Sequence, residues 1–166
     1  MEAWQIAASV ATIVQTIAVI VSLFFIWKQV RQQTLQLEQQ TKLAKTANAQ
    51  ALFEMASPFN MQVIQERSMA ELIFEGHKNY ESFDEVNKFR YKGTLTWRLA
   101  FQELMYYQNK KDLLDTFIYQ AWEDDFKTFI KRRELKSRWA ELEQFYNPEF
   151  RSYVSETIEK VDSGHE

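Results

Sequence analysis

The N-terminal part of the chain holds a long uninterrupted run of apolar residues. From Ile6 to Trp27 no charged residue, glycine or proline occurs. As a helix this run reaches about 33 Å, enough to cross the ~30 Å hydrocarbon core of a bilayer. A cleaved signal peptide would begin with basic residues and hold a shorter apolar stretch, and a buried soluble helix rarely stays uncharged over so many turns. The pattern predicts a membrane-spanning helix, with Trp4 and Trp27 at the two interfaces.

The charges on either side of this run predict its orientation. No lysine or arginine precedes it, whereas Lys28, Arg31, Lys42 and Lys45 follow it. Positive charge collects on the cytoplasmic side of single spans. We therefore expect the N-terminus outside, the C-terminal part in the cytoplasm and the lipid bilayer as a partner.

The predicted span has one polar face. At about 100° per residue its polar side chains gather on one side of the helix, opposite an aliphatic side. A polar face turned to lipid would leave amide and hydroxyl groups unpaired, so the face predicts contact with a second copy of the chain, another protein or water. Alternatively, the hydroxyls bond back to their own helix and only Gln15 needs a partner. This oligomer or pore face consists of Ser9, Thr12, Gln15, Thr16 and Ser22.

Residues 28–57 contain no glycine or proline and are predicted to continue the membrane helix as a juxtamembrane rod. Two interpretations are open for its thin apolar seam. The seam could space parallel copies in an oligomer, or the helix could lie against the bundle of its own chain. Ser57 and Pro58 predict a break or kink at the end of the rod. The seam consists of Val30, Thr34, Leu37, Thr41 and Ala44.

The remaining sequence predicts a cytoplasmic helical bundle at 58–162, followed by a frayed tail at 163–166. A capping-box pattern at Ser82 predicts the start of a long helix, whose core stripe begins with Val86, Phe89 and Gly93. Asp112 is expected to cap the next helix, and Asn147 with Pro148 to open the last one.

No stretch alternates like a strand between hairpin turns, so the fold class is all-α. The predicted architecture is a transmembrane helix (1–27), the rod (28–57) and an irregular four- to five-helix bundle.

Composition and charge narrow the function classes. The 166 residues include three glycines, two prolines and no cysteine, which excludes disulfides, thiolate metal sites and a cysteine nucleophile. The net charge is −3 and the pI near 5.5, which argues against nucleic acid as a partner. The mean hydropathy of −0.43 averages an apolar anchor with a polar remainder.

The sequence holds no catalytic, metal or cofactor pattern. The histidines are His77, expected in a loop, and His165 in the tail, and the one carboxylate at a helical interval from His77 is Glu81, four residues after it. The scattered glycines cannot form a phosphate-binding loop. Arg98 and Glu103 on the long helix are expected to form a structural ion pair. The sequence therefore predicts a protein that is not an enzyme and needs no cofactor.

Several short motifs carry a resemblance to a known group. The stretch from Lys28 to Thr34 and the later motifs together resemble an uncharacterised family of small bacterial single-pass membrane proteins, which implies a bacterial inner membrane. The later motifs are Arg98–Glu103, Tyr106–Gln108, Leu113-Leu114, Trp122, Trp139 and Tyr146–Phe150.

The layout is more distantly similar to the membrane-anchored helical accessory protein of type VI-B CRISPR systems, an oligomeric pore with a HEPN-related bundle. HEPN nucleases use a closely spaced arginine and histidine, and neither histidine here has an arginine at that distance.

These observations lead to one main functional hypothesis and two alternatives. The main hypothesis is a membrane-anchored scaffold without catalytic site that self-associates and presents its bundle to a cytoplasmic protein partner. The first alternative is an oligomeric pore or membrane-perturbing effector, as in antiphage defence. The second is a degenerate HEPN-like RNA-binding bundle.

Overall fold

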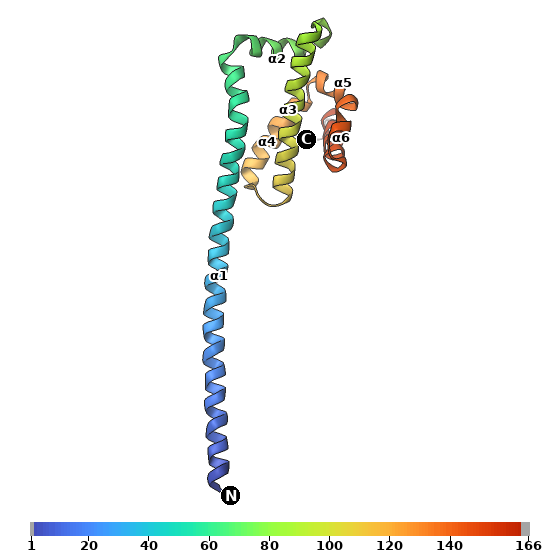
Figure 1. Ribbon diagram of the computed structural model, residues 1–166. Helices are drawn as coiled ribbons and strands as arrows, with labels where there is room; N and C mark the ends of the chain where they lie inside the picture. Colours follow the sequence, from blue (N-terminus) through green and yellow to red (C-terminus); the bar gives the residue numbers. More distant parts are fainter. Residues whose placement is uncertain (1, 164–166) are drawn as a thin grey trace. The chain divides into compact units, whose positions relative to one another are not determined.

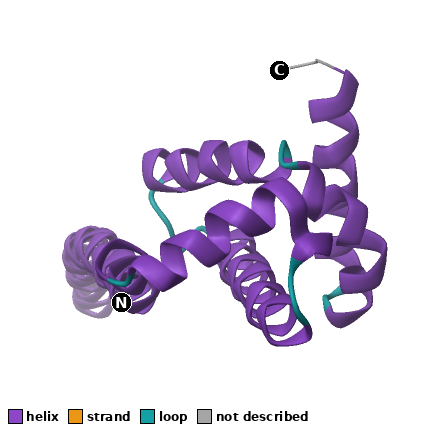
Figure 2. Ribbon diagram, turned by 90° about the horizontal axis from the view of Figure 1, so that it is seen from above, coloured by secondary structure: helices purple, strands orange, loops and turns teal. Residues whose placement is uncertain are grey.

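The described residues form helices joined by short loops, with no strand among them. The computed structural model describes residues 2–163, without the side chains of Glu2, Ile6, Arg133 and Glu134. The predicted all-α class is confirmed, and Figure 2 shows helices joined by short loops. The predicted tail falls mostly on residues 164–166, outside the described residues, while Ser163 is the last residue of α6. The elements in chain order (Figure 1) are α1 (Glu2–Gln65), α2 (Arg67–Asn79), the 3₁₀ turn η1 (Tyr80–Ser82), α3 (Glu85–Lys110), α4 (Thr116–Ile130), α5 (Arg133–Leu142), the 3₁₀ turn η2 (Glu143–Phe145) and α6 (Pro148–Ser163).

The chain divides into two compact units, Met1–Ala44 and Lys45–Glu166. This boundary lies within α1, upstream of the predicted boundary between residues 57 and 58. Residues 45–57 belong to the second unit because Leu52 and Ala56 are buried, with 4% and 2% of their surface exposed. For these residues the structure supports the interpretation that the helix lies on the bundle of its own chain. The rod interpretation is left with residues 28–44, whose side chains are exposed.

α1 continues through Pro58, so the predicted break at this position is wrong. An interior proline removes one helical hydrogen bond and costs about 3 kcal/mol. Packing on both sides of Pro58 offsets this cost. Ala56 is buried before it, and after it the ring of Phe59 stacks on that of Trp97 with 4.2 Å between centroids. The helix ends at Gln65, and Glu66 with an extended backbone separates it from α2.

The second unit has two apolar clusters. The smaller one joins α1 to α3, with Leu52 and Ala56 against Phe101, Met105 and Leu114. The larger one lies where α2 packs on α3 and α5, and α4 on α3, α5 and α6. Its buried members are Leu72, Tyr80, Tyr91, Leu95, Leu99, Phe126, Ile130, Leu135, Trp139, Leu142, Tyr146, Phe150 and Val154.

The predicted core stripe on α3 is wrong at its N-terminal end. Val86 and Phe89 are 68% and 77% exposed, and Gly93 is also exposed. Tyr91 and Leu95 face the larger cluster instead. α3 buries two faces, one against α1 and one against the other helices, and a single stripe cannot describe both.

Two predicted caps are displaced, the first by two residues and the second by three. Asp84 caps α3 instead of Ser82, its carboxylate accepting from the amide of Asn87 at 2.7 Å. Asp115 caps α4 instead of Asp112. Asp112 has a left-handed backbone (φ 54°) and its carboxylate pairs with Lys45 at 2.6 Å. The Asn147 cap of α6 is confirmed, because its side-chain oxygen accepts from the amide of Glu149 at 3.0 Å.

Candidate functional site

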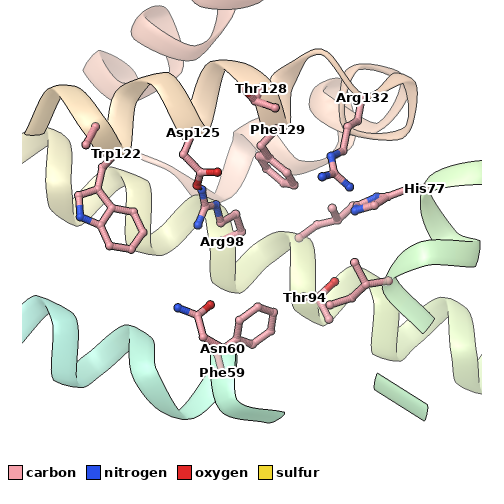
Figure 3. Close-up of a pocket in the computed structure, with 13 residues that line it drawn as sticks. Phe59, Asn60, His77, Thr94, Arg98, Trp122, Asp125, Thr128, Phe129 and Arg132 are labelled. Atoms are coloured by element: carbon pink, nitrogen blue, oxygen red, sulfur yellow. The ribbon is translucent and has the colours of Figure 1, made fainter. Parts of the chain in front are cut away.

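The second unit contains a cavity of about 560 Å³, within the range of about 300–1,000 Å³ typical of small-molecule sites. Its walls come from the last turns of α1, from α2, α3 and α4, and from Arg132 after α4 (Figure 3). The lining residues are Phe59, Asn60, Ile73, His77, Thr94, Leu95, Arg98, Ala121, Trp122, Asp125, Thr128, Phe129 and Arg132.

The aromatic rings of Trp122 and Phe59 line this cavity, Trp122 at one end and Phe59 nearer the middle, below Arg98 (Figure 3). Figure 3 places Trp122 at the end opposite Arg132 and His77. The Trp122 ring is fixed from behind by Phe101, with 5.1 Å between centroids, and Phe59 of α1 is fixed by its stack on Trp97. Held by packing, these rings offer a prearranged apolar surface.

Arg98 and Asp125 form an ion pair in the middle of the cavity (Figure 3). The guanidinium of Arg98 also lies over the rings of Trp122 and Phe129, at 5.8 and 5.7 Å from their centroids. Burial, together with the positive charge of Arg132, lowers the pKa of Arg98 below its ordinary value. Asp125 balances the charge of Arg98 within the chain.

This pairing corrects the predicted ion pair of Arg98 with Glu103. Residues five apart on a helix lie about 140° from each other around its axis, so the two side chains point in different directions. Glu103 instead accepts a hydrogen bond from the backbone amide of Asn147 at 3.0 Å, at the start of α6.

His77 and Arg132 form the polar end. His77 lies in the last turn of α2, not in the predicted loop. Its Nδ1 is 2.7 Å from the hydroxyl oxygen of Tyr91. Burial, and then the charge of Arg132, lower the pKa of His77 to about 4, so the imidazole is neutral at pH 7. Arg132 is exposed, and none of the described carboxylates forms an ion pair with it.

Four polar residues of the predicted oligomer or pore face bond to their own helix. The hydroxyls of Ser9, Thr12, Thr16 and Ser22 each donate to the carbonyl four residues earlier, at 2.8–3.0 Å. This is the alternative that the sequence left open. Gln15 differs, because no hydrogen bond from its amide to another described residue is present.

The seam of the rod has no packing partner among the described residues. Val30 and Leu37 are 54% and 61% exposed, Thr41 and Ala44 are exposed, and the hydroxyl of Thr34 donates to the carbonyl of Val30 at 3.0 Å. Contact of this seam with another copy stays a prediction.

By length and composition, the N-terminal part of α1 could cross a membrane. Among the described residues there is no group of three or more side chains with metal-binding potential.

The cavity was missed by sequence reasoning because its residues come together only in the tertiary fold. The one local signal was the spacing of Trp122, Asp125, Phe129 and Arg132, which places them along one side of a helix.

Comparison with known proteins adds no function to this site. No family model, curated protein or solved structure matches the chain. The resemblance to small single-pass bacterial proteins stays a prediction.

Proposed function

We propose that this protein is a membrane-anchored helical scaffold that self-associates through its span and presents a helical domain in the cytoplasm. Residues 6–27 cross the bacterial inner membrane with the N-terminus outside, as Lys28 and Arg31 favour. The bundle then offers its surface to a cytoplasmic protein partner. No step of this function needs catalysis or a cofactor.

The observation that carries self-association is the amide of Gln15 near the middle of the apolar run, which has no hydrogen-bond partner among the described residues. An unpaired amide in hydrocarbon costs several kcal/mol. With a single span in the described chain, the simplest partner for this amide is Gln15 of a second copy. Interhelical hydrogen bonds of this kind contribute about 0.6–1.7 kcal/mol each in membranes.

The same geometry favours a helix contact over a pore. The hydroxyls of Ser9, Thr12, Thr16 and Ser22 are already bonded within the helix, so they do not need water. Gln15 alone is a single polar side chain per copy, which is too little to line a water-filled channel.

The experiment is the mass of the full-length chain in detergent micelles, measured by analytical ultracentrifugation. We expect an oligomer whose association weakens about threefold or more in Gln15→Leu. Thr12→Val is the matched control, because the Thr12 hydroxyl donates to the carbonyl of Ala8 in its own helix at 3.0 Å. Removing this hydroxyl therefore breaks no contact between copies. A monomeric wild-type chain contradicts the proposal, and equal weakening in both variants contradicts the role of Gln15.

Conductance of the wild-type chain in liposomes tests the pore. If the wild-type chain conducts and Gln15→Leu reduces the current, the protein is a channel and the scaffold proposal is wrong.

Orientation is tested by introducing single cysteines at Ala3 and at Ser152, since the chain has no cysteine of its own. We expect a membrane-impermeant reagent to label only the first in intact spheroplasts.

A further inference from the structure

Four cavity residues lie in line along α4 and just after it. Trp122, Asp125, Phe129 and Arg132 follow each other at intervals of three and four residues, which places them on one side of a helix. Ten residues of helix rise by about 15 Å. Figure 3 shows Trp122 at one end, Asp125 in the middle and Arg132 at the other end. The cavity therefore has three chemically different parts in a fixed order.

The end at Arg132 fits one anionic group. Asp125 balances Arg98, and His77 is neutral at pH 7 because burial and the charge of Arg132 hold its pKa at about 4. The charged lining residues therefore keep one uncompensated positive charge, that of Arg132. A guanidinium can bind phosphate oxygens with two parallel hydrogen bonds. One cation fits a single phosphate better than a chain of three.

The middle part offers a hydrogen-bond acceptor. The Oδ2 atom of Asp125 pairs with Arg98, while Oδ1 has no hydrogen bond to any other described residue. The Asp125 side chain is 58% exposed and borders the cavity. A carboxylate in this position accepts from hydroxyls, as acidic residues do from ribose in nucleotide sites.

The end at Trp122 fits a planar ring. The ring of Trp122 lines this end of the cavity and is held in place by Phe101 behind it. Nucleic-acid bases stack on aromatic rings of this kind in their complexes with proteins.

We propose that this cavity binds a nucleoside monophosphate, with the base at Trp122, a ribose hydroxyl on Asp125 and the phosphate on Arg132. The order of ring, hydroxyl-bearing spacer and single phosphate matches the order of the three parts. The site lies entirely in the unit Lys45–Glu166 and does not depend on self-association of the span.

The test is isothermal titration of the full-length chain in micelles with four probes. Adenosine 5′-monophosphate carries all three parts, adenosine lacks the phosphate, ribose 5-phosphate lacks the ring, and inorganic phosphate lacks ring and spacer. We expect adenosine 5′-monophosphate to bind at least tenfold more tightly than each of the others. Absence of binding at millimolar concentration overturns the proposal, and so does equal affinity of ribose 5-phosphate, because the ring end would then be unused.

A matched pair of variants locates the phosphate. Arg132→Gln should weaken adenosine 5′-monophosphate about tenfold or more and leave adenosine unchanged, because one charge-assisted contact is lost. Arg90→Gln removes the same charge from an exposed position outside the cavity and should change neither affinity. Equal losses in both variants would mean non-specific attraction and would refute the site.

Position is read independently from the imidazole NMR signals of His77, which lies in the cavity wall. These signals should shift on addition of adenosine 5′-monophosphate to the wild-type chain. Binding without such a shift would place the nucleotide elsewhere and overturn the assignment.

Discussion

Gly76 of α2 lies against the ring of Tyr91 of α3, so closely that a Cβ on Gly76 would be 2.4 Å from the Cδ2 atom of that ring. Tyr91 is fully buried, and its ring is surrounded by Tyr80 and Phe83 at centroid distances of 5.7 and 6.2 Å. The ring cannot move aside without disturbing the larger apolar cluster. Contact between α2 and α3 at this point therefore requires glycine.

Gly76→Ala should lower the free energy of unfolding by about 1–3 kcal/mol, the usual cost of overpacking a core. Gly93→Ala is the matched control in α3, because nothing lies within 4 Å of its Cβ position. It should raise stability by about 0.5–1 kcal/mol, since alanine replaces glycine inside a helix. Urea unfolding followed by near-ultraviolet circular dichroism measures both changes. A neutral Gly76→Ala would show that α2 and α3 do not pack this closely.

The division of α1 between the two units predicts different effects for two of its leucines. Leu52 is 4% exposed and contacts the smaller cluster, whereas Leu37 is 61% exposed. Leu52→Ala should cost about 2–4 kcal/mol of unfolding free energy through the cavity that it leaves, and Leu37→Ala should cost less than about 0.5 kcal/mol. The same urea unfolding compares them, at a protein concentration that keeps the chain monomeric. Similar costs for the two would place the boundary of the folded unit upstream of residue 37.

The buried histidine predicts how stability depends on pH. Burial and the charge of Arg132 lower the pKa of His77 from 6.5 to about 4. Between these values the unfolded chain binds more protons than the folded one, so stability rises with pH across this window. Acidification from pH 7 to pH 4 should therefore lower the melting temperature of the wild-type chain more than that of His77→Gln.

The lowered pKa values of Glu141 and Glu149, caused first by hydrogen bonds to Lys92 and Lys110, also reduce stability in acid. This contribution is common to both proteins and cancels in the comparison. Parallel melting curves for the wild type and His77→Gln would contradict the assigned pKa of His77.

The left-handed backbone of Asp112 predicts a ranking of substitutions. With φ at 54°, this position tolerates asparagine and disfavours β-branched residues. Asp112→Asn removes the ion pair with Lys45, whose carboxylate side is 84% exposed, and should cost less than about 1 kcal/mol. Asp112→Val adds backbone strain and should cost about 1–2 kcal/mol more. Thermal unfolding of the two variants measures the difference, and equal stabilities would rule out a left-handed residue here.

Helix content could be predicted from the sequence, but the burial of individual faces could not. Scarce glycine and proline and the spacing of apolar residues were sufficient for the all-α class and for the continuation of the apolar helix beyond Trp27. Periodicity placed Val86 and Phe89 in the core because they are apolar and correctly spaced. Whether a neighbouring helix packs against that end of α3 depends on the tertiary fold, and a local sequence pattern does not show it.

Cap positions failed for a related reason. The segment before α3 offers Ser82 and Asp84, and the segment before α4 offers Asp112 and Asp115, so several residues with capping side chains compete in each. The η1 turn occupies Ser82, and the ion pair with Lys45 holds Asp112. In both segments the last candidate before the helix becomes the cap.

The cavity could not be predicted from the sequence, because the charges that line it are paired between different helices. Arg98 pairs with Asp125 of α4, so its charge is neutralised by a residue 27 positions away. Only after that pairing is known does Arg132 stand out as the uncompensated cation. A count of charges along the chain gives the net value and not its distribution over the cavity wall.

Pro58 makes the α1 wall of the cavity easier to bend than the other walls. Since proline has no amide hydrogen, the helical hydrogen bond from residue 58 to the carbonyl of Glu54 is missing. Phe59 and Asn60, directly after this gap, line the cavity, whereas the walls from α2, α3 and α4 come from helices without proline. A helix that lacks one backbone hydrogen bond needs less energy to bend at that point. The α1 wall is therefore the compliant side of an otherwise stiff cavity, the side where its width can adjust.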